Sequence, residues 1–161
     1  MNSHEELPQI WREPVRDEWC DYNNHLNVAY YILIFDHATD AFYDSVGLDE
    51  AYRAASGCST FAVEMHTNYI AEVRNGAPVY CTTQLLDCDE KRMHYFHRMF
   101  HVEEGYLAAT TEVMAVHVDM SVRRVAPMPP ALLETLGALR AAHADIPVPS
   151  QQGSVIGIRR K

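Results

Sequence analysis

The stretch of residues 28–46 constrains the fold of this chain more than any other part of the sequence. Its apolar side chains recur at helical spacing, as shown by Val28, Tyr31, Ile32, Phe35, Phe42 and Val46. Further apolar residues in the same stretch fall on the other faces of that helix. A helix this apolar around its circumference is expected to be surrounded by protein. Gly47 fits the end of the helix.

Beyond residue 57 the pattern changes from helical spacing to the alternation that is typical of strands. Four long strands are predicted, at residues 60–70, 78–86, 93–102 and 107–120. The segments between them are short and turn-like, which indicates antiparallel neighbours. A sheet of this kind, built beside one long apolar helix, predicts an α+β domain in which an antiparallel sheet wraps around a central helix.

Shorter elements complete the predicted domain, which spans residues 10–145 and is preceded by a polar extension, residues 1–9. Residues 10–20 are predicted to form a first strand, which Pro14 restricts to a sheet edge. A short helix at 49–55, a short strand at 123–126 and a helix at 131–143 are also expected, followed by a mobile tail, residues 146–161. Because open sheet edges and a half-wrapped helix are usually completed by a second subunit, we expect a homodimer or homotetramer.

Charge and cysteine content narrow the class of partner. The formal net charge is -9, which argues against binding to nucleic acid or to an anionic membrane. The N-terminal residues lack the apolar core of a signal peptide, and no uncharged apolar stretch is long enough to span a bilayer. The four cysteines are scattered without a C-x-x-C pair, as expected for free thiols in the cytoplasm.

The turn at residues 21–27 is the strongest candidate for a catalytic site. It places Asp21, His25 and two asparagine amides directly before the long helix, whose first backbone N–H groups are unpaired and can polarise a carbonyl. An aspartate there can attack that carbonyl or activate a water against it. A structural interpretation is equally open: Asn24 or Asn27 caps the helix, and Asp21 forms an Asx-turn.

Other polar residues support weaker hypotheses. Glu64 and His66 share one face of a predicted strand, where they can either face the turn or face solvent. None of the nine histidines has the spacing of a known metal motif, so no metal site is predicted. The basic pairs at 91–92 and 123–124 can contact phosphates or remain solvated at strand ends.

The turn resembles a motif of the hotdog-fold acyl-CoA thioesterases of the 4-hydroxybenzoyl-CoA thioesterase type. That motif runs D-x-x-G-H-hydrophobic-N with a tyrosine four residues on, and it is matched here by Asp21, His25, Leu26, Asn27 and Tyr31. Asn24 replaces the usual glycine, and asparagine is the residue best able to do so at positive φ.

A closer resemblance is to the betainyl-CoA thioesterases, including the thioesterase domain fused to some carnitine dehydrogenases. It extends over residues 21–25, 38–42, 63–66, 83–86 and 89–97. The resemblance implies a thioester hydrolase that needs no cofactor, because coenzyme A is part of the substrate. It implies catalytic roles for Asp21, His25, Asn27, Val28 and Glu64, and substrate contacts by Tyr22, Asn24, Tyr31 and His66.

The acyl group and the reaction class leave alternatives open. If the acyl group is betainyl, its trimethylammonium can bind in an aromatic cage drawn from Trp19, Tyr22, Tyr30, Phe61 and Tyr69. A hotdog hydratase or dehydratase would use a carboxylate of the central helix, such as Asp36 or Asp40, although its histidine signature is absent. A non-catalytic acyl-CoA-binding protein is the alternative from another class.

Overall fold

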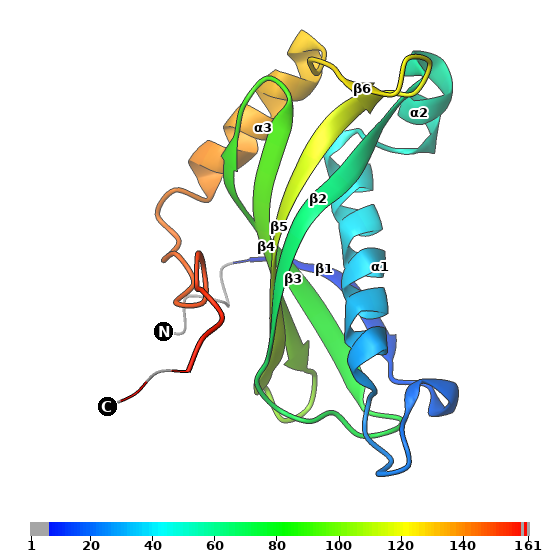
Figure 1. Ribbon diagram of the computed structural model, residues 1–161, viewed down its shortest axis with the longest axis vertical. Coiled ribbons are helices and arrows are strands. Elements are labelled where there is room, and N and C mark those ends of the chain that lie inside the picture. The colour runs from blue at the N-terminus through cyan, green and yellow to red at the C-terminus, as the bar shows by residue number, and fades with distance from the viewer. Residues whose placement is uncertain (1–6, 159, 161) are drawn as a thin grey trace.

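The protein folds as one strongly curled antiparallel sheet with a long helix lying in its concave face (Figure 1). The computed structural model describes residues 7–158 and residue 160. Residues 1–6 of the predicted extension, and residues 159 and 161 of the predicted tail, lie outside the described residues. The elements are β1 (Gln9–Pro14), α1 (Val28–Val46), α2 (Glu50–Ser56), β2 (Cys58–Tyr69), β3 (Pro78–Cys88), β4 (Arg92–His101), β5 (Leu107–Asp119), β6 (Arg124–Val125) and α3 (Pro130–Ala142).

The sheet order is β1-β3-β4-β5-β2, with every neighbouring pair antiparallel and β6 paired to β5. This confirms the predicted α+β class and the four predicted long strands. The two edges of the main sheet are β1 and β2, so the chain closes neither edge by itself. An uncovered edge strand is a site where another chain can pair.

Helix α1 has the limits expected from the sequence, because local signals mark both of its ends. The Asn27 side chain accepts a hydrogen bond from the Ala29 N–H, and Gly47 ends the helix at a φ of 88°. Ile34, Phe35 and Ala38 are completely buried against the concave face. The opposite side of the helix carries Asp36, Asp40 and Asp44, which are exposed. One chain therefore encloses only about half of this helix.

The prediction of a continuous strand over residues 10–20 is wrong after Pro14. Strand β1 ends at Pro14, and the chain then makes a turn of 3-10 helix at Asp17–Trp19. Pro14 has no N–H to donate to a ladder, and the next amide, Val15 N, bonds to Ala77 O in a loop. The edge position predicted for β1 is confirmed.

Helix α3 packs against β3 and the C-terminal half of α1, and the chain after it crosses to the outer face of the sheet. Leu132 and Leu136 of α3 are buried beside the C-terminal half of α1. Residues 146–154, here called the strap, then run along the face opposite α1 (Figure 1). Within the described chain, no helix is long and apolar enough to cross a membrane.

Candidate active site

The turn before α1 is held by backbone hydrogen bonds at both of its ends. Asp21 N donates to His25 O at 2.9 Å, and Leu26 N donates to Val73 O at 2.8 Å. Asn27 N donates to Trp19 O at 2.9 Å, which ties the start of α1 to the 3-10 turn. These bonds fix the position of Asp21 relative to the N-terminal end of α1.

The two carboxylate oxygens of Asp21 have different environments. Oδ1 accepts the N–H of Asn23 at 2.8 Å and, more weakly, the N–H of His25 at 3.4 Å. Oδ2 has no hydrogen-bond partner among the described residues, and the side chain is only partly buried. The Asx-turn interpretation therefore accounts for one oxygen and leaves the other free for chemistry.

The first turn of α1 offers one backbone donor. The N–H of Asn27 bonds to Trp19, and that of Ala29 is taken by the cap. The N–H of Tyr30 bonds to Asn27 O. Within the described chain, the N–H of Val28 has no partner. Of the two amides expected to stabilise an oxyanion, those of Asn27 and Val28, only the Val28 N–H is therefore free among the described residues. It lies at the positive end of the helix dipole.

Asn24 has the backbone geometry expected of a residue that replaces glycine. Its φ is 61°, in the left-handed region. Its carbonyl accepts the N–H of Asn75 at 3.2 Å, which links the turn to the loop before β3. Asn24 therefore shapes the turn through its backbone.

His25 lies close to a carboxylate other than Asp21. Its Nδ1 is 3.4 Å from Oε2 of Glu72, and no hydrogen bond joins its ring to Asp21 among the described residues. Its backbone pairs with Arg74 in an isolated bridge. This geometry favours a role of His25 in holding the turn over a role in orienting Asp21. Glu72 was not predicted, because nothing in the sequence places that loop beside the turn.

The tyrosines near the turn differ in accessibility. Tyr31 is buried and donates its hydroxyl to Ala71 O at 3.2 Å, while its ring packs edge-on against Tyr69. Tyr69 is 48% exposed and lies beside the helix start, with its hydroxyl 3.4 Å from Val28 O. Tyr22 is 96% exposed. In one chain, Tyr69 and Tyr22 are therefore the rings that a substrate at the turn can reach.

The other residues of the expected aromatic cage are already engaged or lie elsewhere. Trp19 stacks on Tyr30 with ring centroids 5.8 Å apart. The guanidinium carbon of Arg16 lies 4.7 Å from the centre of the Trp19 ring, so a cation of the protein already uses this ring. Phe61 lies opposite Val116, on the face of the sheet away from α1.

Glu64 and His66 do not face the turn within one chain. Ala62 is opposite Ala115, but a register shift then places Glu64 opposite Met114 and His66 opposite Glu112. This β-bulge turns both side chains to the outer face of the sheet, away from α1. There they line a cavity of about 460 Å³ together with His94, Glu112 and residues 153–155 of the C-terminal segment.

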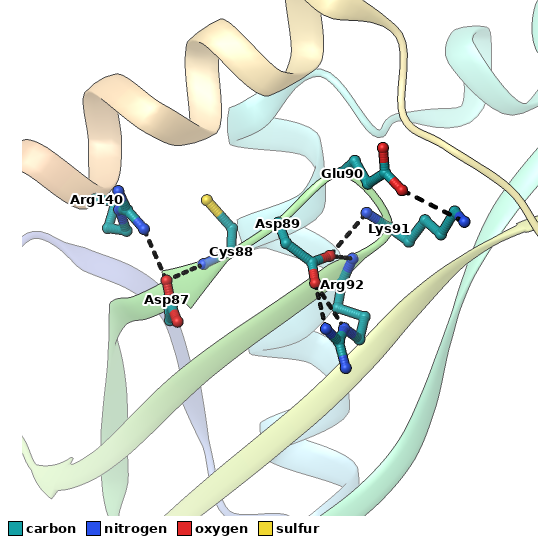
Figure 2. Close-up of polar contacts among 7 residues, drawn as sticks. All are labelled: Asp87, Cys88, Asp89, Glu90, Lys91, Arg92 and Arg140. Atoms are coloured by element: carbon teal, nitrogen blue, oxygen red, sulfur yellow. Dashed lines mark hydrogen bonds and ion pairs between the residues drawn. The ribbon is translucent and has the colours of Figure 1, made fainter.

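Neither predicted basic pair lies near the turn. Lys91 lies in the β3–β4 turn and Arg92 begins β4, and both are paired with acidic neighbours (Figure 2). Arg92 Nε donates to Asp89 Oδ2 at 2.7 Å, and Lys91 Nζ lies 3.4 Å from Glu90 Oε1. The 123–124 pair lies at the same end of the sheet (Figure 1). Among the described residues, Arg16 and Arg74 lie next to the turn, Arg16 over the Trp19 ring and Arg74 paired with His25.

The histidines of the strands have structural partners. His97 is completely buried between the hydroxyls of Thr39 and Thr83, at 3.0 and 2.8 Å, and burial lowers its pKa to about 3. His94 Nε2 lies 2.7 Å from Glu112 Oε1. Among the described residues, no group of three or more His, Cys, Asp or Glu side chains is arranged to hold a metal ion.

Comparison with known proteins identifies relatives over nearly the whole chain. The profile of the thioesterase-like superfamily matches residues 15–136. The betainyl-CoA thioesterase of Pseudomonas aeruginosa is 43% identical over 148 residues, which cover 92% of this chain and 93% of that protein. The L-carnitine dehydrogenase/betainyl-CoA thioesterase of Agrobacterium fabrum is 41% identical over 145 residues, which cover 90% of this chain and 29% of that longer protein.

Solved structures agree with this relationship. The protein SAV2348 from Staphylococcus aureus, solved in complex with CoA, is 31% identical with a TM-score of 0.87, covering 92% of this chain and 94% of that one. A putative thioesterase from Pseudomonas putida KT2440 is 32% identical with a TM-score of 0.83, covering 96% and 98% of the two chains. The chain therefore belongs to the thioesterase-like superfamily, as a hotdog-fold acyl-CoA thioesterase.

Proposed function

We propose that the protein hydrolyses betainyl-CoA to glycine betaine and free coenzyme A. The observation that carries this proposal is the 43% identity to a betainyl-CoA thioesterase over almost the full length of both proteins. The turn geometry is compatible with it, since a carboxylate oxygen of Asp21 and the N–H of Val28 are both without partners in the described chain. No cofactor takes part in the proposed reaction.

In the proposed reaction Asp21 acts at the thioester carbon through Oδ2. As a general base it takes a proton from water, whose oxygen bonds to the carbonyl carbon. The Val28 N–H stabilises the resulting oxyanion. The C–S bond then breaks, and the sulfur leaves with the proton from Asp21. As a nucleophile, Asp21 Oδ2 would instead bond to the carbonyl carbon as the C–S bond breaks and the coenzyme A thiolate leaves. Water would then hydrolyse the acyl anhydride, which restores the Asp21 carboxylate and supplies the proton to the thiolate. Both routes use the same two groups.

Tyr69 and Tyr22 are the residues we propose to contact the trimethylammonium group. Tyr69 adjoins the helix start and is half-exposed, while Tyr22 lies within the turn itself. Cation–π attraction contributes about 0.5–2 kcal/mol for each ring. For the phosphates of coenzyme A we propose Arg16 and Arg74, because both adjoin the turn.

We further propose that two copies of the chain pair along β2 into a homodimer, which can assemble further into a homotetramer. Strand β2 is an edge of the sheet and exposes apolar side chains, namely Phe61, Val63, Met65 and Tyr69, by 44–59%. An exposed apolar edge of this kind is a typical site of pairing with another chain. Since Tyr69 adjoins Val28, the partner would border the active site. The free cysteines are consistent with our placing the protein in the cytoplasm.

The experiment that tests this function compares thiol release from betainyl-CoA and from its uncharged analogue 3,3-dimethylbutyryl-CoA. The two acyl groups match in shape, so a pocket that recognises the cation favours betainyl-CoA by about one to several decades in kcat/KM. Equal efficiencies would indicate a general short-chain thioesterase. If no acyl-CoA releases thiol, the protein is a binding module and the proposal fails.

A further inference from the structure

A cavity of about 460 Å³ opens on the outer face of the sheet, opposite α1. Three adjacent strands form its floor, and the residues that line it there are Glu64 and His66 of β2, His94 of β4, and Glu112 and Met114 of β5. The end of the strap, Gly153 and Ser154, forms a rim together with Val155. The cavity is therefore bounded both by the sheet and by the C-terminal part of the chain.

One charge of this cavity is not neutralised within the chain. Glu112 Oε1 lies 2.7 Å from His94 Nε2, and Glu112 Oε2 accepts the N–H of Gly153 at 2.7 Å. Glu64, by contrast, has neither a hydrogen bond nor an ion pair within the described chain. Its cross-strand neighbour is Met114, so an unpaired carboxylate lies beside an apolar thioether. Such a cavity suits an occupant that carries both positive charge and apolar side chains.

An apolar patch adjoins the cavity on the same face. Phe61 is opposite Val116, which is the next outward-facing residue of β5 after Met114. Phe61 is 45% exposed, and Met114 and Val116 are partly exposed. An exposed group of apolar side chains beside a polar cavity is typical of a surface that another chain covers.

The chain beyond the strap has the chemistry that the cavity and the patch require. Val155, Ile156 and Ile158 are 85%, 87% and 87% exposed, so residues 155–158, here called the apolar segment, leave nearly all of their apolar surface in water. Three basic residues follow in the sequence, namely Arg159, Arg160 and Lys161. Figure 1 shows that the apolar segment leads away from the sheet on the side opposite α1. In this position it is available to another molecule.

We propose that two copies of the chain associate through their outer faces, with the apolar segment of each copy docked in the cavity and on the apolar patch of the other. The basic residues that follow the segment then meet Glu64 of the partner subunit. Because the segment begins at the rim of the cavity, a two-fold axis beside that rim brings each segment to the cavity of the other copy. Such reciprocal contact is what an isologous interface requires.

Charge favours a second copy as the partner of this segment. The chain as a whole has a net charge of -9, so its basic end is complementary to another copy, whereas an anionic membrane would repel the rest of the chain. The outer-face association leaves β2 free. Together with the pairing proposed along β2 it gives a tetramer, and it does not depend on the identity of the acyl group.

Sedimentation equilibrium of the whole protein in low salt tests this interface. Ile156→Ser with Ile158→Ser should raise the dissociation constant of the outer-face association by about tenfold or more, which halves the number of subunits per particle. Both side chains are exposed in one chain, so the variant should keep its fold, as circular dichroism can check. Val122→Ser is the matched control, because it removes an apolar side chain that is 61% exposed in the turn after β5. It should leave the number of subunits unchanged.

A charge exchange tests which surface receives the segment. The triple variant Arg159→Glu, Arg160→Glu and Lys161→Glu should weaken the association, and so should Glu64→Arg alone. All four changes together should restore most of it, because opposite charges again meet across the interface. Weakening without recovery would show that the segment does not dock at Glu64 and would overturn the proposal.

Two other outcomes would also contradict the outer-face interface. If Met65→Asp halves the number of subunits while the serine variant leaves it unchanged, the copies pair along β2 alone. If the wild type sediments with phosphatidylserine vesicles and the serine variant does not, the apolar segment binds a membrane instead of a second copy.

Discussion

Replacing Val28 with proline tests whether the first amide of α1 stabilises the transition state. Proline removes the N–H and leaves the rest of the backbone in place. Val28 is the first residue of the helix, where proline is favoured because its φ suits the helix. The residue before it, Asn27, has φ -69° and ψ 147°, which is the extended conformation that precedes proline without strain.

The structure sets the expected size of the effect. Val28 is 55% exposed and its N–H has no partner in the described chain, so Val28→Pro should change the free energy of unfolding by about 0.5 kcal/mol or less. Loss of one oxyanion donor lowers kcat by about 10²–10³-fold, equivalent to about 2.7–4 kcal/mol. Activity should therefore fall steeply while stability is kept.

The assay is steady-state thiol release, combined with urea denaturation of the same samples. Val28→Ala is the matched control, because it also replaces the valine side chain but keeps the backbone N–H. It should retain kcat within a few-fold. A Val28→Pro enzyme that is folded and turns over at the wild-type rate would refute the assignment of this amide.

Three further predictions concern the turn, the core and the β2 edge. Asn24→Ala should lower the free energy of unfolding by about 1 kcal/mol in urea denaturation, because its φ is 61°, whereas Asn24→Gly should be tolerated. Since burial lowers the pKa of His97 to about 3, well below its unfolded value of about 6.5, the unfolded state binds the extra proton. The free energy of unfolding should thus fall as pH decreases from about 6.5 towards 3. In His97→Gln its slope against pH should be shallower by up to about 1.4 kcal/mol per pH unit. Identical slopes in wild type and variant would contradict this prediction. Met65→Asp should shift sedimentation towards a monomer, whereas an unchanged distribution would argue against pairing along β2.

The parts of the fold that the sequence predicted correctly are those specified by local signals. The limits of α1 follow from the capping of Asn27 and the positive φ of Gly47. The long strands follow from the alternation of side chains along the sequence, even for β2, in which no residue is buried in the single chain. The left-handed conformation of Asn24 was also predictable, because few residues other than glycine adopt it.

The parts that could not be predicted depend on long-range contacts or on a single inserted residue. The bulge between Ala62 and Glu64 inverts the faces of Glu64 and His66, and no local residue pattern signals it. Glu72, Arg16 and Arg74 come to the turn through loops, whose paths depend on tertiary packing. The sequence analysis included Trp19 in an aromatic ligand cage, but in the folded chain the guanidinium of Arg16 lies over the Trp19 ring.

The central claim, that Asp21 carries out thioester hydrolysis, is tested most directly by thiol release from betainyl-CoA with Asp21→Asn. Asparagine keeps an Oδ1 acceptor for the N–H of Asn23, so the turn and the binding of the CoA ester should persist. It removes the ionised oxygen, so kcat should fall by about 10²–10⁴-fold or more. Unchanged binding with that loss of turnover is the predicted result, and turnover near the wild-type rate would contradict the account.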